Sequence, residues 1–134
     1  MINTDNGSIR INDELMITSE YTFEDFRKTR FYKNQDGIRI VYLEEKQMID
    51  EREYMVSLFF RNKRIYSVSL ICGDEQYSEK NEYKRKERHD KILREYGISE
   101  KGEFDWGRIE SGYDAKGNVS SIDIFYYDKE NKKR

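Results

Sequence analysis

One stripe of side chains combines three groups that could perform acid–base chemistry on a phosphodiester. Glu82, Arg85 and His89 are spaced so that, at 3.6 residues per turn, they lie along one side of a helix. In such a site a carboxylate and an imidazole exchange protons while a guanidinium stabilises the developing charge. Glu82 and His89 would stand roughly 10 Å apart along the helix axis, so their side chains would have to converge on the scissile group. A small metal-independent nuclease or hydrolase is therefore one hypothesis for this chain.

The same stripe has a structural interpretation. It continues into Ile92, Leu93 and Tyr96, an apolar half that must face a sheet. An intrahelical pair between Glu82 and Arg85 would then let the polar half of the stripe emerge into water. Exposed pairs of this kind contribute little stability, so the spacing alone is weak evidence of a catalytic site. We favour the structural interpretation and keep catalysis as the alternative.

The helix that carries this stripe is strongly basic. Between residues 84 and 94 it holds six Lys or Arg residues against two acidic ones, a local charge of 6 − 2 = +4. Lys84, Arg88 and Lys91 could track phosphates, which makes a nucleic-acid-binding protein a further hypothesis. The whole chain, however, has a net charge of −2 and a pI near 5.6. A solvated helix face explains the pattern more simply, and nucleic acid is not the expected partner.

The composition predicts one folded domain over residues 1–134, with frayed ends at 1–7 and 129–134. Hydrophobic residues make up 36% of the chain, which is enough for a thin core. Eighteen of the 19 aromatic residues are Tyr or Phe, and that much ring surface is uncommon in disordered chains.

The lone cysteine and lone histidine exclude much common chemistry. Cys72 has no partner for a disulfide or a multi-cysteine zinc site, and its place in an alternating strand predicts burial. No phosphate-binding glycine motif, dinucleotide fingerprint or serine-nucleophile motif is present, so we expect no cofactor and no metal. No apolar run is long enough to span a bilayer, and the first residues do not resemble a secretory signal. We therefore expect a cytoplasmic protein without a membrane segment.

The pattern of elements predicts an α+β fold. Thr22 and Asp25 form the spacing of a capping box, and Gly97 suits the left-handed position after a helix that Ser78 would cap. We expect a mainly antiparallel sheet of about five to six strands, with one long helix packed on one face and a short N-terminal helix. The expected strands are 8–11, 14–17, 38–43, 53–60, 65–72, 104–111 and 120–127, and the expected helices are 23–28 and 79–96.

The sheet face that the long helix leaves free is rich in aromatic and acidic residues. Alternation along the strands places Phe59, Asp123, Phe125 and Tyr127 on that side, with Glu110 nearby. The short N-terminal helix would cover part of it, and the remainder has the composition of a protein-binding surface. These five residues are the predicted partner contacts. The same rings would equally complete a second small core.

The C-terminal third carries a resemblance. Residues 106–114 (WGRIESGYD) and 120–124 (SSIDI), followed by Tyr126, resemble the ends of small uncharacterised bacterial proteins. Those proteins are similar, in size and in helix-plus-sheet layout, to immunity proteins that neutralise polymorphic or contact-dependent toxins. The resemblance implies a stoichiometric inhibitor that binds a toxin through a charged and aromatic surface. It contains no catalytic signature and transfers no role to an individual residue.

The sequence therefore favours a non-enzymatic, cytoplasmic protein-binding module, in its most concrete form an immunity protein bound to a toxin domain. The hydrolase that would use Glu82, Arg85 and His89 and the nucleic-acid binder that would use helix residues 84–94 stay open as alternatives. Unpaired edge strands would also allow a homodimer.

Overall fold

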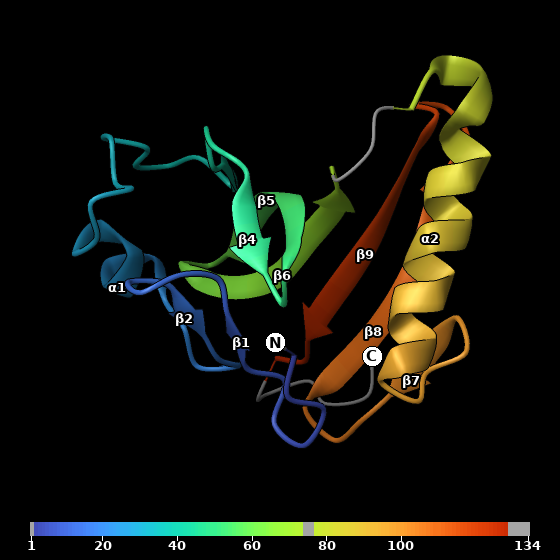
Figure 1. Ribbon diagram of the computed structural model, residues 1–134. Coiled ribbons are helices and arrows are strands. Elements are labelled where there is room, and N and C mark those ends of the chain that lie inside the picture. Colours follow the sequence, from blue (N-terminus) through green and yellow to red (C-terminus); the bar gives the residue numbers. More distant parts are fainter. Residues whose placement is uncertain (1, 74–76, 129–134) are drawn as a thin grey trace.

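The computed structural model describes residues 2–73 and 77–128 (Figure 1). Its chain folds into short N-terminal elements, a large sheet and one long helix. The elements follow in this order: β1 (Ile9–Arg10), β2 (Met16–Ile17), α1 (Phe23–Arg27), β3 (Ile40–Tyr42), β4 (Gln47–Ile49), β5 (Arg52–Arg61), β6 (Arg64–Cys72), a 3-10 turn (Glu79–Asn81), α2 (Glu82–Glu95), β7 (Lys101–Glu103), β8 (Gly107–Asp114) and β9 (Val119–Tyr126).

The main sheet is antiparallel and has seven strands among the described residues, in the order β3-β5-β6-β9-β8-β7, with β4 also paired to β5. β1 and β2 form a separate two-stranded ladder. The α+β class is confirmed, but the sheet is larger than the expected five to six strands. The additional strands, β4 and β7, have three residues each, so they are too short to show the alternation that marks a strand in sequence.

The long β5–β6 hairpin forms where the sequence predicted it. Its two turn residues, Asn62 and Lys63, have positive φ values of 52° and 65°. Positive φ at both central positions is the geometry of a type I′ turn, whose twist matches that of paired strands.

The helix α1 is fixed by the predicted capping box. The Thr22 hydroxyl accepts from the Asp25 N–H at 3.1 Å, and the Asp25 carboxylate accepts from the Thr22 N–H at 3.0 Å. Phe23 and Phe26 are buried and pack on Phe60 of β5, with ring centroids 5.2 and 6.1 Å away. Because Phe60 faces the core, α1 lies on the same side of the sheet as the core. The expectation that it covers the opposite face is wrong.

The helix α2 begins three residues later than predicted, because residues 79–81 form a 3-10 turn, and the Ser78 side chain makes no capping hydrogen bond. Its end agrees with the prediction. Gly97 has a φ of 80°, and the N–H of Ile98 donates to the carbonyl of Leu93 at 3.0 Å, as in a Schellman motif. Ile92 and Leu93 are buried where α2 packs on β8, β9 and β6.

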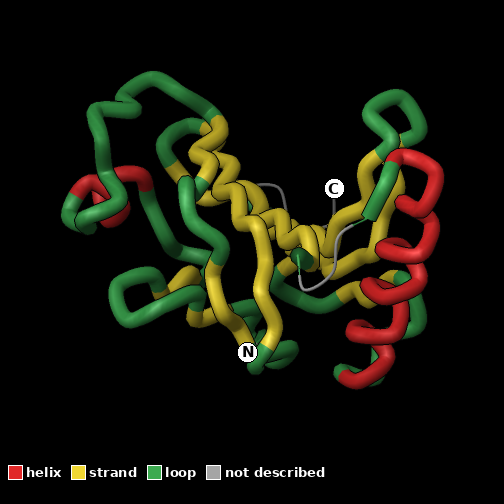
Figure 2. The backbone as a smooth tube through the Cα atoms, turned by 45° about the horizontal axis from the view of Figure 1, so that its top comes forward, coloured by secondary structure: helices red, strands yellow, loops and turns green. Residues whose placement is uncertain are grey.

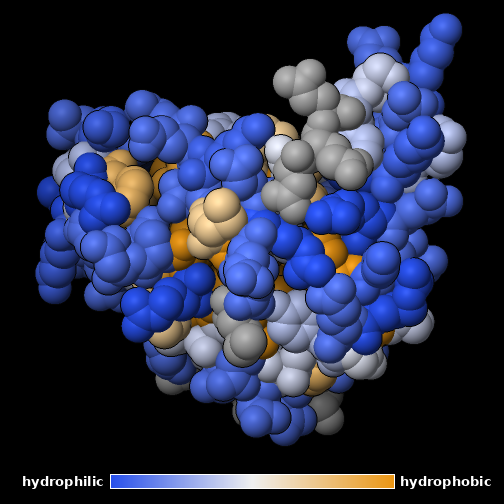
Figure 3. Space-filling model, in the orientation of Figure 1, coloured by the Kyte–Doolittle hydropathy of each residue, from blue (hydrophilic) through white to orange (hydrophobic). Residues whose placement is uncertain are grey.

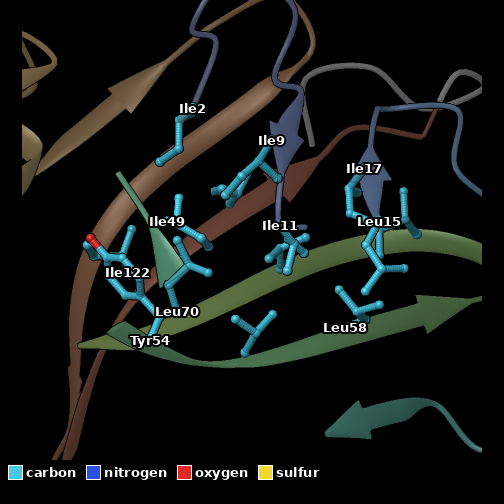
Figure 4. Packing of buried hydrophobic residues seen from close by; sticks show 14 of the residues in the cluster. Ile2, Ile9, Ile11, Leu15, Ile17, Ile49, Tyr54, Leu58, Leu70 and Ile122 are labelled. Atoms are coloured by element: carbon cyan, nitrogen blue, oxygen red, sulfur yellow. The ribbon is translucent and has the colours of Figure 1, made fainter. Parts of the chain in front are cut away.

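Alternate residues of the central strands form one core face. Their register aligns Val56 with Leu70 and Leu70 with Ile122, and all three are buried. α2 covers this face over β8 and β9, whereas the N-terminal elements cover it over β5 and β6 (Figures 1 and 2). Figure 4 shows side chains such as Ile9 and Ile17 pointing toward the strands. Hydrophobic surface is visible between the N-terminal elements and α2 (Figure 3).

The N-terminal residues are packed rather than frayed. Ile2 is buried and pairs with Ile9, and the Trp106 indole N–H donates to the Thr4 carbonyl at 2.8 Å. Gly7, with a φ of 77°, lies against the Trp106 ring. The expected fraying of 1–7 is therefore wrong for residues 2–7, and 129–134 lies outside the described residues.

In the part of the chain that is described, no helix is long and apolar enough to cross a membrane.

Candidate protein-binding face

The side chains that alternate with the core residues point to the other face of the sheet, which we call the open face. Its register aligns Phe59 of β5, Ser67 of β6, Phe125 of β9 and Arg108 of β8 in one row across four strands. Phe59, Phe125 and Arg108 are half-buried, and the neighbouring Met55 is 40% exposed. The face therefore offers apolar surface to a partner.

A bulge adds one more ring to this row. Phe59 pairs with Ser67, but Phe60 pairs with Ile65, so Tyr66 is an extra residue in β6. Such a bulge re-aims a side chain at the point where the register shifts. The Tyr66 ring consequently lies between the other two rings, 5.4 Å from the Phe59 centroid and 5.9 Å from that of Phe125.

Arginines flank the three rings. The Arg61 guanidinium carbon lies 3.8 Å from the Tyr66 ring centroid, and that of Arg108 lies 4.1 Å from the Phe125 centroid. Such cation–π contacts are worth roughly 0.5–1 kcal/mol at exposed sites, and they hold the guanidinium groups in place. We call Phe59, Tyr66 and Phe125 with these two arginines the aromatic row. Aromatic and arginine side chains are the types most enriched among residues that dominate protein interfaces.

Two carboxylates lie next to the aromatic row. Asp123 of β9 pairs directly with Glu110 of β8, which places two acidic side chains opposite each other. Burial raises the pKa of Asp123, and Glu110 raises it further, while hydrogen bonds from Ser121 and Ser69 and the charge of Arg108 oppose the rise. Arg108 also donates to Glu110, at 3.3 Å. A cation from a partner would relieve the repulsion between the two carboxylates.

The structure brings four of the five predicted contact residues to this face: Phe59, Glu110, Asp123 and Phe125. Tyr127 follows the last residue of β9 and lines a separate cavity with Trp106. Sequence reasoning also missed Tyr66, because period-two alternation places it on the same side of its strand as Cys72, which was predicted to be buried. Nothing in the local sequence marks the bulge that turns it outward.

The stripe on α2 is buried where the helix meets the sheet. Glu82 is 6% exposed, and its Oε2 accepts from both the N–H and the hydroxyl of Ser120 at 3.0 Å. Arg85 donates to the same carboxylate at 3.2 Å and lies over the Tyr77 ring at 4.7 Å. The predicted pair exists, but it joins α2 to β9 instead of emerging into water.

His89 lies deeper at the same junction. Its side chain is fully buried, and its Nε2 accepts from the backbone N–H of Cys72 at 3.0 Å. Burial, together with the nearby Arg85 charge, lowers the pKa of His89 to about 4, so the imidazole is neutral at pH 7. Cys72 is also fully buried, which confirms its assignment to the core. Glu82, Arg85 and His89 each have a structural contact, and their catalytic role stays a prediction.

The basic face of α2 is partly neutralised. Lys86 lies 2.7 Å from Asp90, and Arg85 is paired with Glu82. Lys84 and Lys91 are exposed, whereas Arg88 is half-buried. Phosphate binding by this helix stays a prediction.

Among the described residues, no group of three or more His, Cys, Asp or Glu side chains is arranged to hold a metal ion.

Comparisons with known proteins add a likeness of fold. No protein-family model matches the sequence, and no curated protein does. The structure is similar to a chain of a solved complex described as Rhs1-CT in complex with cognate immunity protein RhsI1. The TM-score is 0.59, the sequence identity is 14%, and the match covers 93% of this chain and 85% of that one.

Proposed function

We propose that this protein is an immunity protein, which neutralises a cognate toxin domain by stoichiometric binding and has no catalytic activity of its own. The observation that carries the proposal is the aromatic row beside the Glu110–Asp123 carboxylates, on the sheet face opposite the core. The likeness to a chain of a toxin–immunity complex supports the same function.

Each part of the open face has a role in this proposal. The rings of Phe59, Tyr66 and Phe125 provide the apolar anchors that dominate binding energy in protein interfaces. Arg61 and Arg108 retain N–H donors for acceptors at the edge of the toxin. The Glu110–Asp123 pair accepts a lysine or arginine, which favours a toxin surface of complementary charge. The bound protein then covers the catalytic or receptor surface of the toxin.

The experiment that tests this function begins with a tagged pull-down from the native host at low and high salt. The partner is identified by mass spectrometry and then expressed alone and together with this protein in a sensitive host. We expect one stoichiometric partner that is toxic alone and harmless when co-expressed. A partner that is not toxic, or toxicity that persists on co-expression, would rule out the proposal.

Variants locate the surface. Phe59→Ala combined with Phe125→Ala removes two anchors of the aromatic row, and we expect it to abolish protection. The matched control, Lys84→Ala with Lys91→Ala, changes two exposed residues of α2 and should protect fully. Full protection by the first variant would place the toxin on another surface. A circular dichroism melt shows whether each variant is folded.

A further inference from the structure

A second surface lies at the tip of the β5–β6 hairpin. A groove of about 730 Å³ runs between α1, the loop 36–39 and the turn of this hairpin. Backbone hydrogen bonds fix its walls, since the Phe23 N–H donates to the Lys63 carbonyl at 2.8 Å and the Phe60 N–H to the Arg39 carbonyl at 2.7 Å. Figure 1 shows α1 beside this end of the hairpin. The groove is thus bounded by backbone that is already ordered.

The floor of the groove is apolar. Phe23 and Phe60 lie edge to face with centroids 5.2 Å apart, and both are buried. Ile38 stands at the side of the groove and is 51% exposed, a high value for so large an aliphatic side chain beside buried rings. Because both rings are buried, Ile38 is the residue of this groove that offers apolar contact to one side chain of a ligand.

The rim carries an excess of positive charge. Four cationic and two acidic residues line the groove: Arg27, Arg39, Lys63, Arg64, Glu24 and Asp36. The Arg27 guanidinium lies 3.6 Å from the carboxylate of Glu24 and 3.7 Å from that of Asp36. Both acidic residues of the rim are therefore already paired with one cation. Arg39 and Lys63 are exposed and have no acidic partner in the part of the chain that the structure describes. The complementary ligand is therefore acidic.

We propose that this groove binds an acidic segment of the toxin domain that carries one apolar side chain. The inference rests on the proposed function, because it assigns the segment to the same partner. The groove adjoins the aromatic row, since Arg61 of that row is two residues before Lys63 at the rim. This supports the assignment of both surfaces to one partner. A partner on the open face reaches the groove by passing the tip of the hairpin, with its apolar side chain against Ile38 and its carboxylates beside Arg39 and Lys63.

The test uses a fluorescein-labelled peptide of glutamates around a single leucine, with fluorescence anisotropy as the readout. We expect saturable binding that weakens roughly fivefold or more when the leucine is changed to alanine, because the apolar contact is lost. Binding should disappear when the glutamates are changed to lysines. Chemical-shift changes in the labelled protein should map to the groove. Absence of saturable binding, or shifts confined to other surfaces, would overturn the proposal.

Protein variants separate local charge from net charge. Arg39→Glu with Lys63→Glu should weaken peptide binding roughly tenfold, and the milder Arg39→Gln with Lys63→Gln should weaken it less. Lys84→Glu with Lys91→Glu makes the same change in net charge on α2 and should bind the peptide as the wild type does. Equal binding by the Arg39→Glu, Lys63→Glu variant and this control would refute the groove as the site.

Different experimental outcomes contradict the groove inference and the proposed immunity function. If the pull-down yields a neutralised toxin but the peptide does not bind, only the groove inference falls. If the peptide binds at the groove but no toxic partner exists, the immunity function falls. With the toxin in hand, the Arg39→Glu, Lys63→Glu variant should bind it at least about tenfold more weakly than the α2 control does. Equal affinities would remove the toxin as the ligand of the groove.

Discussion

The carboxylate of Glu82, in the first turn of α2, accepts hydrogen bonds from both the N–H and the hydroxyl of Ser120, near the start of β9. Both residues are buried, and they are 38 positions apart in the chain. This contact fixes the beginning of the helix to the start of β9. It makes Glu82 a structural residue whose removal should be costly.

We expect Glu82→Gln to lower the free energy of unfolding by about 1–3 kcal/mol, because it leaves the half-buried Arg85 without its counter-charge. Urea denaturation measures the change. Glu87→Gln, at an exposed position of the same helix, is the matched control and should stay within about 0.5 kcal/mol of the wild type. Equal effects of the two substitutions would contradict the role assigned to Glu82.

The buried His89 should make the free energy of unfolding depend on pH. His89 has a pKa of about 4 in the folded protein and 6.5 as its unperturbed value, so between these values the unfolded chain binds the additional proton. The contribution of His89 is complete above about pH 6.5 and is lost as the pH falls toward 4. Between pH 7.5 and 5 the loss should be about 2 kcal/mol.

Urea denaturation across this pH range checks the prediction. His89→Gln keeps an acceptor for the Cys72 N–H but cannot be protonated, so it should lose most of the pH dependence above pH 5. A wild-type stability that is constant from pH 7.5 to 5 would show that His89 titrates normally in the folded state.

The contact between Gly7 and Trp106 predicts a sharp difference between two glycines. A Cβ at Gly7 would overlap the Trp106 ring, whereas a Cβ at Gly37 would meet nothing within 4 Å. Both have left-handed backbone, with φ values of 77° and 81°. Gly37→Ala should cost about 1 kcal/mol through backbone strain, and Gly7→Ala about 2 kcal/mol more through overlap. Similar melting temperatures for the two variants would argue against packing of the N-terminal residues on Trp106.

Asp123 should show a trade-off between stability and binding. Asp123→Asn removes a partly buried charge whose pKa is raised, and it relieves repulsion from Glu110. The free protein should gain about 0.5–1 kcal/mol, whereas affinity for the toxin should fall roughly tenfold because the acceptor of a cation is weakened. Thermal melts and calorimetric titration measure the two effects. A variant that is more stable and binds equally well would exclude Asp123 from the interface.

Local signals predicted several elements of the fold. The Thr22–Asp25 capping box located α1, and Gly97 located the end of α2, because each signal depends on residues close in sequence. β4 and β7 were missed because three-residue strands form by pairing with a longer neighbour. The placement of the N-terminal residues depends on Trp106, a contact across about a hundred positions that no local pattern records.

The open face was predicted in part because the alternation of side chains along a strand is also a local signal. Alternation within regular strands places Phe59, Asp123 and Phe125 on one side, and the hairpin registers align them. Alternation does not place Tyr127 with them, because β9 ends at Tyr126, and Tyr127 lines a cavity with Trp106. Tyr66 was missed because its direction is set by a shift in pairing between β5 and β6. Partnerships such as Glu82 with Ser120 likewise become visible only in three dimensions.

The position of β9 has a consequence for biosynthesis. This strand is the last in sequence among the described residues, yet it lies between β6 and β8 in the middle of the sheet. During translation, β5 and β6 can pair early, but β8 cannot join them in one sheet until β9 has been made. Because Phe125 and Asp123 belong to β9, a nascent chain lacks the complete open face. The open face can become competent to bind only after β9 has been synthesised.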